Sequence, residues 1–79
     1  MEIHLIKEKI SNVLVSILGH NNFETHDELT AKDVDGWDSL SHMIILTTIE
    51  ETFDIKFKLR DLNKLKNMGS LVAVIQSKI

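Results

Sequence analysis

The segment Asp-Gly-Trp-Asp-Ser-Leu at 35–40 has the clearest chemical potential in this sequence. Asp38 and Ser39 are both preferred helix caps, and an apolar run with helical spacing follows them, so we expect a helix to begin here. The unpaired amides of a helix N-terminus favour a negative group, so a phosphate ester on Ser39 would lie in a favourable field. Asp38 could also offer an oxygen to a divalent cation. On these residues alone, a modification site and a plain helix cap are both open.

Three neighbours would hold the Asp38-Ser39 pair in place. Gly36 lets the chain turn sharply before the pair. Trp37 and Leu40 are apolar residues that bracket it and can serve as anchors. We therefore expect the Ser39 hydroxyl to be accessible to solvent at a helix start that is anchored on both sides.

Other arrangements for catalysis or metal binding are poor. No Gly-x-Ser-x-Gly segment surrounds any serine, and three scattered glycines form no phosphate-binding loop. The histidines lack the i, i+4 pair beside a carboxylate that a helical zinc site shows. His42 could share a helix face with Ser39, but such a contact without an orienting carboxylate and an oxyanion hole does not define a nucleophile. We expect neither enzymatic activity nor a metal site.

The elements that position the 35–40 segment are expected to be helices. Apolar residues at every third or fourth position predict an amphipathic helix over 2–18 that ends at Gly19. Residues 20–37 have no period and predict a long loop, for which Leu29 and Val34 are candidate anchors. A second helix is expected from Asp38-Ser39 to Phe53.

The C-terminal third predicts one short and one longer helix. Residues 54–59 alternate polar and apolar side chains but have no partner strand, so we expect an extended connection. Leu62 and Leu65 predict a short helix over 60–66. A last helix is expected to open at Gly69-Ser70, with Ser70 as its N-cap. The fold class that follows is all-α, a small bundle of three longer helices plus one short helix.

Length and composition favour one domain over residues 1–79. With 79 residues and 43% hydrophobic residues, a core is expected, but a thin one. The chain contains no cysteine, which excludes disulfides, a cysteine nucleophile and thiolate metal sites, and fits a reducing compartment. No apolar run approaches the roughly 18 residues needed to span a bilayer. We expect a cytoplasmic, monomeric protein without membrane contact.

Charge is unevenly distributed along the chain. Residues 24–38 carry six acids against one lysine, and residues 39–54 add three acids and no base. Residues 55–79 carry six bases against one acid, although the net charge of the whole chain is only −3. Nucleic acid binding needs a contiguous basic face, so the acidic centre argues against a nucleic acid partner.

Over its whole length the sequence resembles an acyl carrier protein. The resemblance lies in the size, the first amphipathic helix, the long loop, the Gly-Trp-Asp-Ser-Leu40 motif, the helix ending Ile-Glu-Glu-Thr-Phe53, and a short third helix before a fourth. It implies that Ser39, flanked by Asp38 and Leu40, receives 4′-phosphopantetheine from coenzyme A through a phosphopantetheinyl transferase. The terminal thiol would then carry acyl groups as thioesters to acyl-activating and acyl-transferring enzymes of a fatty-acid-like or specialised biosynthetic pathway.

The resemblance also implies an acyl cavity between the helices. Candidate lining residues, for each of which plain core packing is the alternative, are Met43, Leu46, Ile49, Phe53, Leu62 and Ile75. The gain on inserting an acyl chain would be apolar area removed from water, at roughly 25 cal/mol per Å².

Members of this family that serve fatty acid synthesis usually carry many carboxylates along the second helix, which meet basic patches on partner enzymes. Asp38, Glu50 and Glu51 remain here, but Ser41 and Ile44 stand where the family often has carboxylates. The basic tract 56–66 is also unusual. These departures favour a specialised carrier rather than a housekeeping one, with Ile44 as an apolar partner contact.

Two other functions remain open. An aminoacyl or peptidyl carrier uses the same serine chemistry, but such modules often have a Gly-Gly-His/Asp-Ser-Leu context where this chain has Gly36-Trp37. An unmodified helical adaptor would use Asp38 and Ser39 only as helix caps. Attachment of phosphopantetheine distinguishes the carriers from the adaptor.

Overall fold

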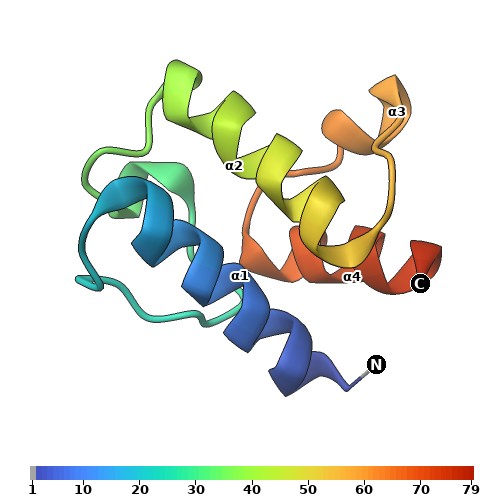
Figure 1. The fold of residues 1–79 in the computed structure, drawn as a ribbon, viewed down its shortest axis with the longest axis horizontal. Coiled ribbons are helices and arrows are strands. Elements are labelled where there is room, and N and C mark those ends of the chain that lie inside the picture. Colours follow the sequence, from blue (N-terminus) through green and yellow to red (C-terminus); the bar gives the residue numbers. More distant parts are fainter. Residues whose placement is uncertain (1) are drawn as a thin grey trace.

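Four α-helices and a single 3-10 turn make up residues 2–79, the part of the chain that the computed structural model describes (Figure 1). The elements are α1 (Ile3–Leu18), the turn η1 (Ala31–Asp33), α2 (Ser39–Phe53), α3 (Leu59–Leu62) and α4 (Met68–Lys78). Residues 2–79 contain no strand. The predicted all-α class, with three longer helices and one short one, is confirmed.

The core lies where α1 packs against both α2 and α4. Figure 1 shows α1 and α2 side by side and running in opposite directions, with α4 crossing beside them. Six side chains of these helices are fully enclosed: Ile6, Ile10, Leu14, Ile45, Ile49 and Ile75. The three α1 members, Ile6, Ile10 and Leu14, are spaced by four residues and belong to the apolar stripe predicted from the sequence.

The end of α1 follows from one glycine. Gly19 has a φ of +78° and donates its backbone N–H to the carbonyl of Val15 at 2.9 Å. Glycine, which has no Cβ, takes this left-handed conformation without steric strain. The predicted helix end at Gly19 is confirmed.

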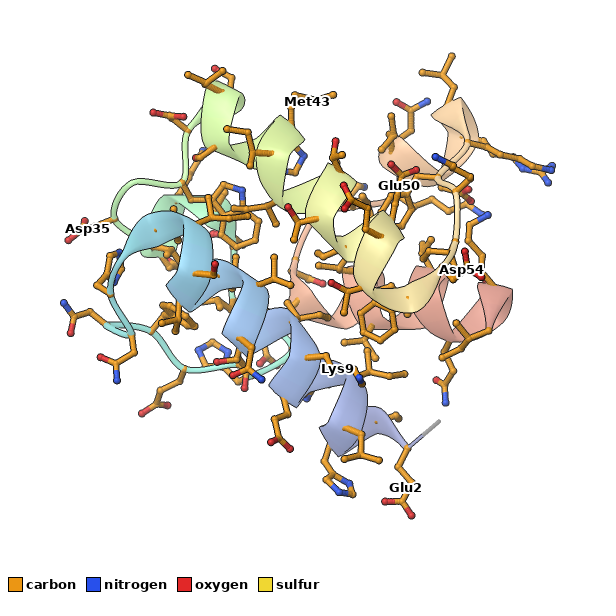
Figure 2. All side chains as sticks on the ribbon, viewed as in Figure 1. Glu2, Lys9, Asp35, Met43, Glu50 and Asp54 are labelled. Atoms are coloured by element: carbon orange, nitrogen blue, oxygen red, sulfur yellow. The ribbon has the colours of Figure 1, made fainter. Side chains whose placement is uncertain are left out.

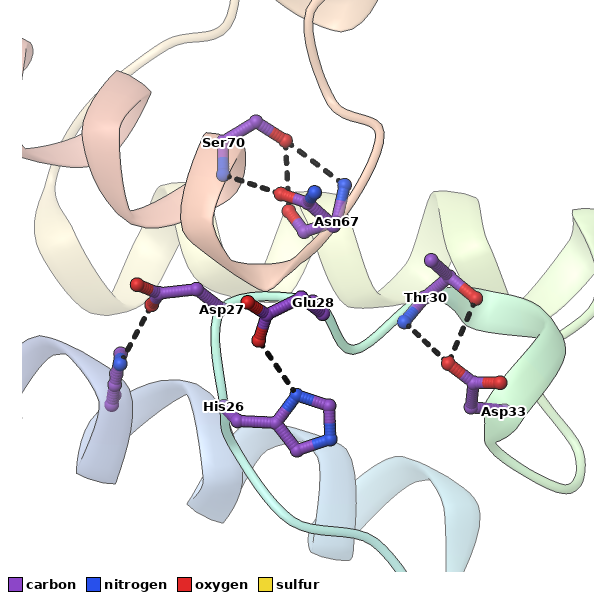
Figure 3. Close-up of polar contacts among 8 residues, drawn as sticks. His26, Asp27, Glu28, Thr30, Asp33, Asn67 and Ser70 are labelled. Atoms are coloured by element: carbon purple, nitrogen blue, oxygen red, sulfur yellow. Dashed lines mark hydrogen bonds and ion pairs between the residues drawn. The ribbon is translucent and has the colours of Figure 1, made fainter.

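The long loop over 20–37 is fixed to the start of α4. The amide of Met68 donates to the carbonyl of Leu29 at 2.8 Å, and the amide of Gly69 donates to that of Asp27 at 2.9 Å. Lys7 of α1 pairs with the Asp27 carboxylate at 2.8 Å (Figure 3). Leu29 is buried, as is Val34, so both predicted anchors are confirmed.

The predicted N-cap of α4 is wrong, because the observed cap lies three residues before the predicted Ser70. Asn67 is the N-cap, and its side-chain oxygen accepts from the amide of Ser70 at 2.9 Å (Figure 3). The Ser70 hydroxyl in turn accepts from the amide of Asn67, so Ser70 is the third helical residue of a capping box. A cap therefore exists, but asparagine supplies it.

The third helix is shorter than the predicted range 60–66. It spans only Leu59–Leu62, and the chain continues in turns in which Lys64 donates to Asp61 and Leu65 to Leu62. These i→i+3 bonds still turn Leu65 toward the core, where it packs half-buried. The spacing of Leu62 and Leu65 is thus satisfied without a continuous α-helix.

Candidate functional site

Ser39 is the first residue of α2 and is exposed. Its hydroxyl has no hydrogen-bond partner within residues 2–79, whereas the hydroxyl of nearby Ser41 is fully engaged. Figure 1 shows the start of α2 at an edge of the molecule, where the loop enters the helix. The predicted accessibility of this hydroxyl therefore agrees with the structure.

Asp38 is the cap of α2. Its Oδ1 accepts from the amides of Leu40 at 3.1 Å and Ser41 at 2.9 Å. The Ser41 hydroxyl accepts from the amide of Asp38 at 2.8 Å and donates to the carbonyl of Gly36 at 2.7 Å. The amide and then the hydroxyl of Ser41 lower the pKa of Asp38 below its ordinary value of 3.8, because both stabilise the charged form.

This cap changes one expectation drawn from the sequence. The amides of Leu40 and Ser41 are already occupied by the Asp38 carboxylate, so they are not free for a phosphate on Ser39. Asp38 Oδ2 has no partner within residues 2–79 and can still ligate a cation. Within the same range, no three His, Cys, Asp or Glu side chains gather in a geometry that would hold a metal ion.

The loop that leads into Ser39 is held in a turned conformation. Gly36 has a φ of +85°, which is strained for any residue with a Cβ. His20, the first loop residue after the Gly19 cap of α1, donates from Nε2 to the carbonyl of Asp35 at 2.6 Å. The turn is therefore fixed both by its glycine and by a contact across fifteen residues.

His42 pairs with Trp37, not with Ser39. The Trp37 indole donates from Nε1 to His42 Nδ1 at 3.0 Å, and the two rings stack with centroids 6.1 Å apart. Because Nδ1 accepts this bond, the proton of the neutral imidazole lies on Nε2. This contact gives His42 a structural role and offers no base to the serine.

A mostly apolar pocket opens between the loop, α2 and the start of α4. It is lined by Leu29, Thr30, Ala31, Trp37, His42, Leu46, Leu65, Lys66, Asn67, Met68 and Leu71. Leu46 is the one predicted acyl-cavity residue among them. Trp37 connects this pocket to the segment that presents Ser39.

The other predicted cavity residues lie elsewhere. Ile49, Phe53 and Ile75 are buried in the core, and Leu62 is partly buried against it. Met43 does not point inward: it is 57% exposed and lines a shallow surface groove with Ile44 and Thr47. The core-facing side of α2 carries Ile45, Leu46 and Ile49. Met43 therefore lies on the outer face of the helix.

Most of the pocket lining was not predicted from the sequence. Leu65, Met68 and Leu71 come from the region where the start of the last helix was misplaced. The Asn-x-x-Ser pattern at 67–70 is the signal that could have located the cap at Asn67 and Met68 inside the helix.

The predicted partner-binding residues differ in their surroundings. Ile44 is 47% exposed and lies with Leu40 and Met43 on an open apolar face of α2. Glu51 is exposed, but Glu50 is half-buried, and its Oε2 accepts from the amide of Phe57 at 2.8 Å (Figure 2). Glu50 therefore fixes the chain after α2 and is not a free surface carboxylate.

Comparisons with known proteins agree with this geometry. Residues 8–75 match the family described as "Phosphopantetheine attachment site". The chain is 33% identical over 70 residues to an acyl carrier protein of Exiguobacterium sp. (strain ATCC BAA-1283 / AT1b), covering 89% of each protein. Its fold matches the solution NMR structure of holo acyl carrier protein from Geobacter metallireducens with a TM-score of 0.84 and 33% identity, over 92% of this chain and 84% of that one.

The family match over residues 8–75 defines a phosphopantetheine-bearing carrier domain. The chain belongs to the acyl carrier protein family. It is a non-catalytic carrier with covalently bound 4′-phosphopantetheine as its prosthetic group. None of the helices described in residues 2–79 has the length and apolar character to cross a bilayer.

Proposed function

We propose that Ser39 is the attachment site, and that the chain carries acyl groups as thioesters on the attached 4′-phosphopantetheine for a specialised biosynthetic pathway. The observation that carries the proposal is the free, exposed hydroxyl of Ser39 at the first position of α2. The Asp38 cap and the Gly36 turn fix the backbone on which that hydroxyl stands. A transferase can therefore reach a pre-organised nucleophile without first unfolding the loop.

The residues around Ser39 fit such a group. Ser39 is exposed and its neighbour Leu40 is 74% exposed, so the approach to the hydroxyl is open. When bound, the prosthetic group supplies the thiol that this cysteine-free chain lacks. The chain itself provides the attachment point, orients the prosthetic group and presents the surface that partner enzymes bind.

The apolar pocket beside Trp37 is the proposed shelter for the acyl chain. Leu46 lies at one wall, and Met68 and Leu71 lie at another, so the lining comes from both α2 and α4. An acyl chain would gain by leaving water, at roughly 25 cal/mol per Å² of apolar area. The buried core residues Ile49, Phe53 and Ile75 would border it only if the helices move apart.

We further propose that the partners are a phosphopantetheinyl transferase and acyl-handling enzymes of a dedicated cytoplasmic pathway. Leu40, Met43 and Ile44 give α2 an exposed apolar face, with Glu51 as its nearby exposed carboxylate. Such a face favours partners with a matching apolar patch over partners that rely on charge alone.

The test is the intact mass of the chain after co-expression with a phosphopantetheinyl transferase. We expect the mass to rise by one phosphopantetheine in the wild type and in Ser16→Ala, which removes an exposed hydroxyl on α1. Ser39→Ala should stay unmodified while keeping its helical circular dichroism spectrum. An unmodified wild type would refute the proposal and favour a helical adaptor.

A further inference from the structure

Five exposed basic side chains gather on α3 and the segments that flank it. We call them the basic α3 surface: Lys56, Lys58, Arg60, Lys64 and Lys66. None of them takes part in the ion pairs found among residues 2–79. Their charges are therefore available to a partner.

The one acid in this segment does not neutralise the basic α3 surface. Asp61 is only 8% exposed, and its Oδ2 accepts from Lys78 Nζ and from the amide of Lys58, both at 2.8 Å. Lys78, at the C-terminal end of α4, therefore compensates the charge of Asp61. The same contacts tie α3 to α4, so the basic α3 surface is held in place.

An exposed leucine stands in the middle of these cations. Leu59 is 77% exposed, more than any other large apolar side chain of the described residues, and lies between Lys58 and Arg60. Apolar side chains that protrude from a charged surface are characteristic of docking points, where burial is specific and the charged rim orients the partner.

Carboxylates adjoin the basic α3 surface on its α2 side. Glu50 accepts from the amide of Phe57, so the end of α2 touches this segment directly; Glu50 and Asp54 are labelled in Figure 2. Glu51, in the last turn of α2, and Asp54, its C-cap, are both exposed. A bilayer or a nucleic acid presents uniform negative charge, so these two acids would weaken its attraction to the five cations. A protein can place acids opposite the cations and other groups opposite Glu51 and Asp54.

We infer that the basic α3 surface docks an acidic surface of a partner protein, with Leu59 entering an apolar recess of that surface. The inference rests on the proposed function, since the partner is an enzyme that handles the thioester. In Figure 1, α3 and the start of α2 both lie along the upper edge of the view. One enzyme could therefore contact the basic α3 surface and the Ser39 region together.

The probe is a synthetic peptide rich in Glu and Asp with one central Leu, titrated into the isotope-labelled chain and followed by amide NMR shifts. We expect saturable shifts in residues 56–66 that weaken as NaCl is raised. Arg60→Glu/Lys64→Glu should raise the apparent Kd at least about tenfold. Leu59→Asn should weaken binding while leaving its salt dependence unchanged.

A matched control is Lys9→Glu/Lys32→Glu, which changes net charge equally but alters exposed lysines outside the basic α3 surface. We expect this variant to bind the peptide as the wild type does. Equal weakening in both double variants would overturn the inference, because it would show a response to net charge only. Tighter binding to vesicles of phosphatidylcholine and phosphatidylglycerol, or dimerisation of the chain in sedimentation, would also overturn it.

The outcome is separable from that of the proposed function. Peptide binding needs no modification of Ser39, so it is measured on Ser39→Ala as well as on the wild type. Phosphopantetheine loading is measured on Arg60→Glu/Lys64→Glu by intact mass. Loading without peptide binding would overturn only this inference, and peptide binding without loading would overturn only the proposed function.

Discussion

The Trp37 indole donates to His42 Nδ1 at 3.0 Å and so ties the loop before Ser39 to the first turns of the helix after it. Both rings also line the apolar pocket. The side chains on either side of the serine are thereby joined to the proposed acyl shelter. The proposed attachment point, Ser39, and the pocket are connected through this one pair.

We predict that this pair stabilises the fold by about 0.5–1.5 kcal/mol, the net contribution of a typical hydrogen bond. Trp37→Phe keeps an aromatic ring but removes the donor, and His42→Leu removes the acceptor. Urea unfolding of both variants and of the double variant gives the coupling energy. Strictly additive losses would show that Trp37 and His42 do not interact in solution.

Gly36→Ala should impair loading of Ser39 as well as stability. Its φ of +85° makes a Cβ cost about 1–2 kcal/mol in the folded state. Gly19→Ala is the control for backbone strain, because Gly19 has a φ of +78° but ends α1 and does not lead into α2. Both variants should lose similar stability in urea, and only Gly36→Ala should be loaded more slowly by the transferase. Equal loading rates would show that the Gly36 turn does not contribute to the loading of Ser39.

Stability should fall in acid partly through Asp61. Hydrogen bonding from Lys78, then from the Lys58 amide, lowers the pKa of Asp61 below its ordinary value of 3.8. Its contribution is therefore complete above 3.8 and is lost as pH falls through the lowered pKa. Asp61→Asn should flatten the acid limb of a plot of unfolding free energy against pH. The slope should not vanish, because the pKa values of Asp33 and Asp38 are lowered too.

The control for this experiment is Asp35→Asn, at an exposed carboxylate that takes part in none of the ion pairs among residues 2–79. Its acid limb should match the wild type. If Asp61→Asn matched the wild type as well, the contact between Asp61 and Lys78 would contribute nothing to acid stability.

Trp37 should report occupation of the pocket. It is the single tryptophan of the chain and lines the pocket wall, so its fluorescence observes this site alone. Loading a medium-length acyl chain onto the holo protein should shift the emission to shorter wavelength, because water leaves the indole surface. A shift of the same size with an acetyl group, which is too short to fill the pocket, would speak against an acyl shelter here.

Local patterns in the sequence were enough to predict most of the helices. The stripe of Ile6, Ile10 and Leu14 and the break at Gly19 depend only on neighbours within the helix, and the Asp38-Ser39 cap signal is equally local. The structure confirms these elements because their sequence signals do not depend on tertiary contacts.

Features that depend on distant contacts were not predictable in the same way. The pocket forms because the loop carbonyls of Asp27 and Leu29 receive the first amides of α4, and no periodicity signals this pairing. The internal role of Glu50 likewise depends on the chain after α2 turning back to offer the Phe57 amide. From the sequence alone, a charged residue on a helix is expected to lie at the surface, and only the structure shows such an internal partner.

The measurement that tests the central claim most directly is fragmentation mass spectrometry of the chain recovered after incubation with coenzyme A and a phosphopantetheinyl transferase. We predict that the fragment containing Ser39 carries the added phosphopantetheine, and that fragments containing Ser41 or Ser70 without Ser39 do not. Phosphopantetheine on any other serine, or on none, would contradict the account.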